Sequence, residues 1–202
     1  NSNKDSIDSF LLERTEFYEI GKFAIANCIL KCENPNEYQF VNNNWLKYLW
    51  NKIAPSKNQF VSCNLKFISF NYDRLIEHFF YISLKHSFNL PDSEINKIIT
   101  HKLITHLHGV VGYFPWQDEK NGFDYYCSGQ DFNLYYERVA QACKSIKIIY
   151  DKFEEDIFDY AWDEIQGADF VYFLGFGFHA LNLKRLKIST LEKTIRCSAY
   201  GL

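Results

Sequence analysis

Short apolar runs alternate with segments of helical periodicity through the second half of the chain. Four runs predict strands: LKFISF (65–70), KLITHLH (102–108), DFVYFL (169–174) and TIRCSAY (194–200). Three segments between them predict helices: DRLIEHFFYISLKHSF, DKFEEDIFDYAWDEIQ and HALNLKRL. Because the strands read as apolar runs rather than as alternating patterns, we expect a parallel sheet with helices on both faces.

The first 60 residues carry helical periodicity without a strand pattern. Apolar residues recur at helical spacing from Phe10 to about Cys32, and NNNWLKYLWNKIA predicts a second helix that an asparagine caps. A loop is expected from Pro55 to Asn58. This part of the chain is therefore predicted to be helical.

These patterns divide the chain into a helical segment over residues 1–60 and a Rossmann-like α/β core over 61–202. The core carries an irregular insertion, rich in aromatic residues, over 110–136. Aromatic side chains of this kind can form a partner surface or a small lobe that packs on the core. SIKIIY (145–150) fits either a strand or the middle of a helix, because periodicity does not separate the two over so short a run.

Composition narrows the class of protein. The chain has 202 residues, of which 47% are hydrophobic and 18% aromatic, and this is far from the composition of a disordered chain. Its formal net charge is -3, which points to neither a nucleic acid nor an anionic membrane as a partner. No apolar run reaches the ~20 residues that span a bilayer, and no signal peptide is visible, so we expect a cytoplasmic protein.

Polar residues and glycines gather where the predicted strands end. They are Asn71-Tyr72-Asp73, His106-Leu107-His108-Gly109, Gly175-Phe176-Gly177 and Tyr200-Gly201. Open parallel sheets bind ligands at the carboxyl ends of their strands. Each group also has a simpler explanation, since Asn71 or Asp73 can cap the next helix and a His-Gly pair often forms only a turn.

These strand ends resemble the motifs of the sirtuins. FISFNYDRLIEH is similar to the sirtuin strand that ends in Asn-x-Asp, with Phe70 where glutamine is usual, and THLHG resembles the strand end with the catalytic histidine. FLGFGFHALN resembles the glycine-rich turn that holds the adenosine ribose, in the spelling of sirtuin-like domains from bacterial phage-defence proteins. TIRCSAYGL resembles the last core strand. The resemblance covers roughly residues 60–202 and keeps the order of the motifs.

The resemblance implies that NAD+ is the substrate and that the reaction releases nicotinamide and ADP-ribose, in bacterial antiviral defence. Cleavage of this glycosidic bond passes through an oxocarbenium-like state. The implied catalytic residues are Asn71, which would position a water or the ribose hydroxyls, and His108, which would act as general base. The implied cofactor-binding residues are Asp73, Gly109, Gly175, Gly177 and Asn182.

Two departures from the sirtuin pattern modify this expectation. Sirtuin deacylases carry two C-x-x-C pairs that bind zinc, and this chain has none, so we expect neither zinc nor protein deacylation. Residues 1–60 also lack the glycine-rich turn that cradles the pyrophosphate. We therefore expect an incomplete sirtuin-like domain of a longer chain that carries this turn upstream. The expected partners besides NAD+ are a second copy of the chain or a fused or partner defence domain.

Three other functions fit parts of the sequence. A chain with this fold but without the first glycine turn could be an inactive domain that senses NAD or ADP-ribose, or an interaction domain. His106 and His108 have a spacing that can hold a metal for a hydrolase, with His101 or a carboxylate as third ligand. GFGFHA (175–180) fits a dehydrogenase fingerprint, but the next predicted strand lacks the acidic residue that such an enzyme needs.

Overall fold

The structure, a computed structural model, describes residues 7–34, 44–125, 131–148 and 155–198. The chain forms two compact units, Asn1–Asp151 and Lys152–Leu202, and each is described by itself. The boundary predicted at residue 60 does not coincide with this division, because the helices that precede residue 60 pack within the first unit.

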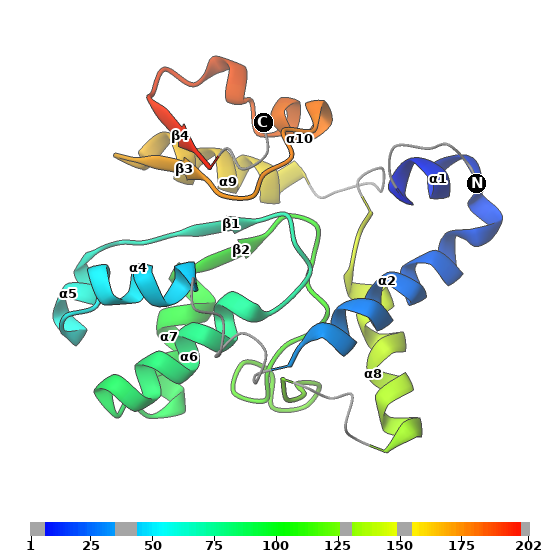
Figure 1. Ribbon diagram of the computed structural model, residues 1–202, viewed down its shortest axis with the longest axis horizontal. Helices are drawn as coiled ribbons and strands as arrows, with labels where there is room; N and C mark the ends of the chain where they lie inside the picture. Colours follow the sequence, from blue (N-terminus) through cyan, green and yellow to red (C-terminus); the bar gives the residue numbers. More distant parts are fainter. Residues whose placement is uncertain (1–6, 35–43, 126–130, 149–154, 199–202) are drawn as a thin grey trace. The chain divides into compact units, whose positions relative to one another are not determined.

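The described elements of the first unit are helices α1 (Ile7–Glu13), α2 (Tyr18–Cys32), α4 (Trp45–Ile53), α5 (Lys57–Ser62), α6 (Leu75–Phe88), α7 (Asp92–Lys102) and α8 (Phe132–Ser145), the 3-10 helix η1 (Thr15–Phe17), and strands β1 (Phe67–Ser69) and β2 (Ile104–His106). Those of the second unit are α9 (Glu155–Gly167), α10 (Ala180–Arg185), η3 (Ile188–Thr190), β3 (Val171–Phe173) and β4 (Ile195–Cys197). Figure 1 shows this mixed α/β content.

Each unit contains one described pair of parallel strands. β1 pairs with β2, with Ser69 opposite His106, and β3 pairs with β4, with Phe173 opposite Cys197. A strand of three residues therefore lies within each of the four predicted runs, and the described strands pair in parallel, in two sheets of two strands each. Their side chains are half-buried or exposed rather than fully buried, so these short strands are not the fully covered strands that the apolar runs predict.

Most predicted helices are present, and capping residues explain where several of them begin. The Asn44 side chain accepts hydrogen bonds from the amides of Leu46 and Lys47, as the asparagine run predicts. The predicted loop over 55–58 is wrong from Lys57 onward, because Ser56 caps α5 there. Gly167 is the last residue of α9, and α7 was not predicted.

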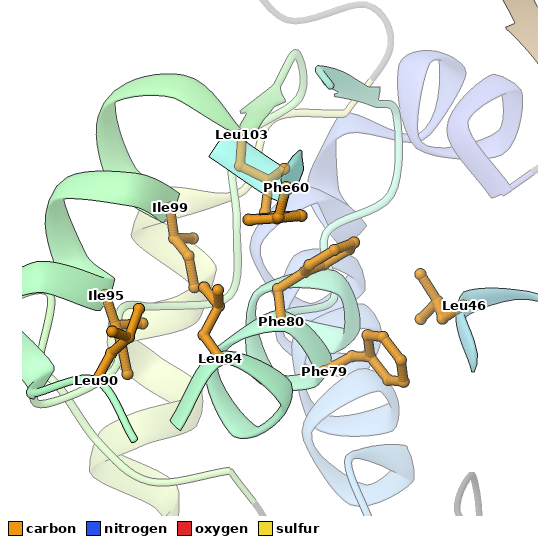
Figure 2. Close-up of a cluster of buried hydrophobic side chains, with 9 residues drawn as sticks. All are labelled: Leu46, Phe60, Phe79, Phe80, Leu84, Leu90, Ile95, Ile99 and Leu103. Carbon is orange, nitrogen blue, oxygen red and sulfur yellow. The ribbon is translucent and has the colours of Figure 1, made fainter. Parts of the chain in front are cut away.

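The helices of the first unit build two hydrophobic cores. One lies between α4, α5, α6 and α7, as Figure 2 shows, and consists of Leu46, Phe60, Phe79, Phe80, Leu84, Leu90, Ile95, Ile99 and Leu103. The turn from α6 into α7 uses Asn89 in the left-handed conformation, which lets Leu90 fold back onto the same core. Burial of each large apolar side chain contributes roughly 1.5–3 kcal/mol.

The second core lies between α2 and α8, which run side by side (Figure 1). Ala26 and Ala142 are fully buried, and their small side chains allow the two helices to approach closely. Val111 and Phe123 from the stretch between β2 and α8 complete this core. SIKIIY begins with Ser145, the last residue of α8. Ile146 is extended, and residues 149–150 lie outside the described part.

A buried ion pair connects these parts of the first unit. Arg74 precedes α6 and is 0% exposed, and its guanidinium binds both carboxylate oxygens of Glu33, at 3.0 and 2.5 Å. The remaining N–H groups donate to the carbonyls of Tyr113, Phe123 and Asp124. Burial raises the pKa of the Glu33 carboxyl, and the Arg74 hydrogen bonds and charge oppose this rise.

Replacement of Arg74 with methionine tests the importance of this pair. We expect the free energy of unfolding to fall by roughly 3–5 kcal/mol, because Glu33 would keep a buried charge without a partner. Urea unfolding measures the change. Arg14→Met is the control: it breaks an exposed pair with Glu16 and should cost about 1 kcal/mol or less. Equal losses in the two variants would contradict this view of Arg74.

Candidate functional site

The ends of β1 and β2 lie side by side at one edge of the first sheet. Ser69 stands opposite His106, and the Leu107 amide donates to the Ser69 carbonyl at 2.9 Å. The segment that begins at Asn71 therefore adjoins the segment that ends at His108. The sequence predicts this proximity, because the carboxyl ends of parallel strands meet at one edge of a sheet.

His106 joins the two strand ends through both nitrogens of its ring. Nδ1 lies 2.8 Å from the Asn71 carbonyl oxygen, and Nε2 lies 2.7 Å from Glu77 Oε1. Both partners are acceptors, so a ring that donates to both is doubly protonated. Burial lowers the pKa of His106, but the carboxylates of Glu77 and Asp73 and the two hydrogen bonds outweigh it and raise the pKa above its ordinary value.

Asn71 has a fixed backbone and an exposed side chain. Its N–H donates to Ser69 Oγ at 3.0 Å, and its carbonyl accepts the hydrogen bond from His106. Within the described part of the chain, its side-chain amide has no hydrogen-bond partner. An amide that is exposed but held by its own backbone suits a residue that contacts a ligand.

Asp73 lies one residue before Arg74, the N-cap residue of α6. Its Oδ1 accepts the Leu75 amide at 3.0 Å, a local hydrogen bond at the start of the helix. This bond gives the carboxylate a structural role close to the capping explanation, and the predicted contact with nicotinamide stays a prediction.

His108 lies inside the strand end rather than on its surface. It is 4% exposed, and its ring meets the rings of Phe70 and Tyr72 edge-on, with centroids 5.6 and 6.3 Å away. Its carbonyl accepts the Lys147 amide at 2.8 Å, and the Tyr72 hydroxyl donates to the Lys147 carbonyl at 2.9 Å. The segment after α8 therefore flanks this strand end and holds it in place.

Gly109 is required by packing. Its φ is +79°, and a Cβ built there would lie 2.0 Å from the Ser145 carbonyl oxygen. A side chain at this position would both strain the backbone and displace the end of α8. Gly109 is therefore needed for the turn after His108, and its predicted contact with a ligand stays a prediction.

The glycine-rich turn after β3 belongs to the second unit. Gly175 has φ +60° and donates its N–H to Ser198 Oγ, beyond the end of β4, at 2.9 Å. Nothing lies within 4 Å of a Cβ built at Gly177, so the backbone is open there. Asn182 is 7% exposed, and its Oδ1 is buried without a hydrogen-bond partner in the described part of the chain.

The aromatic stretch after β2 packs as a lobe on α6. Trp116 stacks on Tyr81 with centroids 4.9 Å apart, and Tyr125 stacks on His78 at 4.1 Å. Of the two alternatives for the insertion, the described rings favour the packed lobe over a partner surface. Burial, together with the charge of Arg74, lowers the pKa of His78 to about 4, so this ring is neutral at pH 7.

The described residues around His106 and His108 do not form a group of metal ligands. Both ring nitrogens of His106 are hydrogen-bonded, and β2 ends at His106, so His108 lies in the following turn. The side chain of His101 lies outside the described residues, and the described ones contain no group of three potential metal ligands. The geometry therefore gives the metal hydrolase no support.

Two residues of this site escaped the sequence analysis. Arg74 and Glu77 are buried at the start of α6, although charged residues at a helix start are usually solvated. The sequence could have indicated their burial through spacing, because Arg74 and Glu77 lie on the same helical face as the buried Phe80 and Leu84. Their partners, Glu33 and His106, are distant in sequence.

Comparison with known protein families, curated proteins and solved structures finds no match to this chain. Among the described helices, none is long and apolar enough to cross a membrane.

Gly109→Ala should destabilise the first unit. We expect a loss of roughly 2–3 kcal/mol in the free energy of unfolding, because the new Cβ would meet Ser145 and the left-handed backbone would be strained. Gly167→Ala is the matched control, since its Cβ meets nothing within 4 Å and alanine favours a helix. The idea would be wrong if urea unfolding gave both variants the parental stability.

His78→Phe should change how stability depends on pH. A histidine with a folded pKa of about 4 against an ordinary 6.5 favours the folded state fully above pH 6.5, and this contribution is lost as pH falls toward 4. The loss amounts to roughly 3 kcal/mol at most. Phenylalanine keeps the stack on Tyr125 but does not titrate, so the variant should gain stability relative to the parent across this window. The assignment would be contradicted if the free energy of unfolding, measured with urea at each pH, changed with pH in the same way in the two proteins.

Proposed function

We propose that this chain carries a sirtuin-like NAD+ glycohydrolase domain, which cleaves NAD+ to nicotinamide and ADP-ribose in bacterial antiviral defence. The observation that carries the proposal is the parallel pairing of β1 with β2, which brings Asn71 beside the His106–Gly109 segment. The order of the motifs along the chain agrees with it. A Rossmann-like sheet with helices on both faces is part of the same proposal, supported by the two parallel strand pairs.

Asn71 supplies the polar group at the reacting centre in this proposal. Cleavage of the nicotinamide–ribose bond develops positive charge on the ribose, and a neutral amide can orient a water or a ribose hydroxyl without adding charge. The exposed amide and fixed backbone of Asn71 meet this requirement. Little backbone freedom is then lost at this residue when the substrate binds.

His108 is the proposed general base. Imidazole titrates near neutral pH, so it can take a proton from a water or a ribose hydroxyl. Its ring is screened from bulk water by Phe70 and Tyr72, and a screened base is protected from competing proton exchange.

Within the second unit, the turn from Gly175 to Asn182 is the proposed binding segment for an adenosine ribose. The open backbone at Gly177 would let a nucleotide approach closely. A ribose hydroxyl could donate to Asn182 Oδ1, a buried acceptor that lacks a donor in the described part of the chain.

The second candidate is a domain that binds NAD or ADP-ribose without turnover. One observation favours it: His108 is only 4% exposed, which is little for a residue that must reach a substrate. Binding without release of nicotinamide distinguishes this function from the glycohydrolase.

Nicotinamide release from NAD+, measured by chromatography with the full-length protein, tests the proposal. We expect Asn71→Ala and His108→Gln to lower the rate by roughly 100-fold or more, because each removes a group that acts in the transition state. Asn51→Ala and His86→Gln replace exposed residues of the same types on α4 and α6 and should keep the parental rate.

Melting temperatures identify any variant that fails to fold. A parent that binds NAD+, seen as a rise in melting temperature, but releases no nicotinamide would support the sensor instead. A parent that shows neither effect would overturn both functions.

A further inference from the structure

Glu77 and His106 link three elements at the strand ends of the first unit. His106 ends β2, Glu77 lies in the first turn of α6, and Asn71 follows β1. The imidazole bridges the Glu77 carboxylate and the Asn71 carbonyl through bonds of 2.7 and 2.8 Å. The side chains of His106 and Glu77 are 9% and 5% exposed, so solvent competes little with these bonds.

Stability alone explains this pair poorly. A buried ion pair often contributes nothing net, because desolvation of the charges offsets their attraction. Glu77 Oε2 is buried without a hydrogen-bond partner among the described residues, which adds a further cost. What the pair does accomplish is to fix one peptide group, the carbonyl of Asn71.

We propose that Glu77 and His106 are positioning residues that hold the Asn71 peptide, and through it the exposed Asn71 amide, in the orientation needed for NAD+ cleavage. The inference rests on the proposed function for its catalytic consequence. Its structural half, the link from Glu77 through His106 to the Asn71 carbonyl, stands on the geometry. The link requires a doubly protonated ring, because a carbonyl and a carboxylate can only accept.

Deprotonation of His106 would break one of its two bonds and release either the carboxylate or the Asn71 peptide. The ionisable groups that face the ring are Glu77 on α6 and Asp73 on the loop before α6, and both are acidic. They raise the pKa of His106, so the link persists above pH 6.5 and is lost as pH rises further. Glu77→Gln removes one charge but keeps an acceptor of the same shape, so it should move this loss to lower pH.

The first test uses NMR on the full-length protein and needs no substrate. The Tyr72 amide nitrogen belongs to the same peptide group as the Asn71 carbonyl, so its shift reports the hydrogen bond from His106. We expect the Tyr72 amide and the His106 ring to titrate together in the parent, and together at lower pH in Glu77→Gln. Glu137→Gln, an exposed site on α8, should leave both midpoints unchanged. Independent titration of Tyr72 and His106 would overturn the link.

The second test uses nicotinamide release. We expect Glu77→Gln to lower kcat roughly tenfold on the alkaline side, with KM changed less than twofold, and to shift the alkaline limb of the pH profile to lower pH. An unchanged profile in an active protein would overturn the positioning role. A parent without NADase activity but with joint titration of Tyr72 and His106 would reject the proposed function and retain the link.

Discussion

The first unit depends on a fully buried cation, the guanidinium of Arg74. A buried arginine needs acceptors for all five of its N–H groups, and here each one has a partner: two on the Glu33 carboxylate and three on backbone carbonyls of residues 113–124. The rings of Phe114 and Phe123 cover the guanidinium, with their centroids 4.4 and 4.2 Å from Arg74 Cζ. The end of α2, the start of α6 and the aromatic lobe are thereby fixed at one point, directly after Asn71-Tyr72-Asp73.

Two histidines near the start of α6, His78 on the helix itself and His106 at the end of β2, have different neighbours. The pKa of His78 is lowered by burial and by the nearby guanidinium. His106 faces Glu77 and Asp73 instead, and its pKa is raised. The pKa values of the two histidines are therefore shifted in opposite directions: that of His78 chiefly by burial, with the charge of Arg74 adding to it, and that of His106 by the carboxylates of Glu77 and Asp73.

The sequence predicts the parts of this fold that depend on local pattern, and misses those that depend on distant partners. Hydrophobic periodicity indicates α6 and β1, and parallel pairing follows from the apolar strands, so the adjacency of Asn71 and His108 could be expected. The burial of His108 could not, because it depends on the rings of Phe70 and Tyr72 and on the segment after α8. No local sequence pattern identifies the partners of the buried Arg74 and Glu77 at the start of α6, because Glu33 and His106 are distant in sequence.

Two buried ion pairs in the described part of the first unit differ in how completely their polar groups are hydrogen-bonded. Arg74 and Glu33 satisfy each other, and the guanidinium has no N–H group left over, which is the condition under which a buried pair stabilises a fold. Glu77 and His106 leave one carboxylate oxygen without a partner, so their pairing is a poorer solution for stability alone. Their bonds end on the backbone of Asn71, the residue with the exposed amide. The first pair therefore holds the unit together, while the second determines the orientation of one peptide group at the strand end.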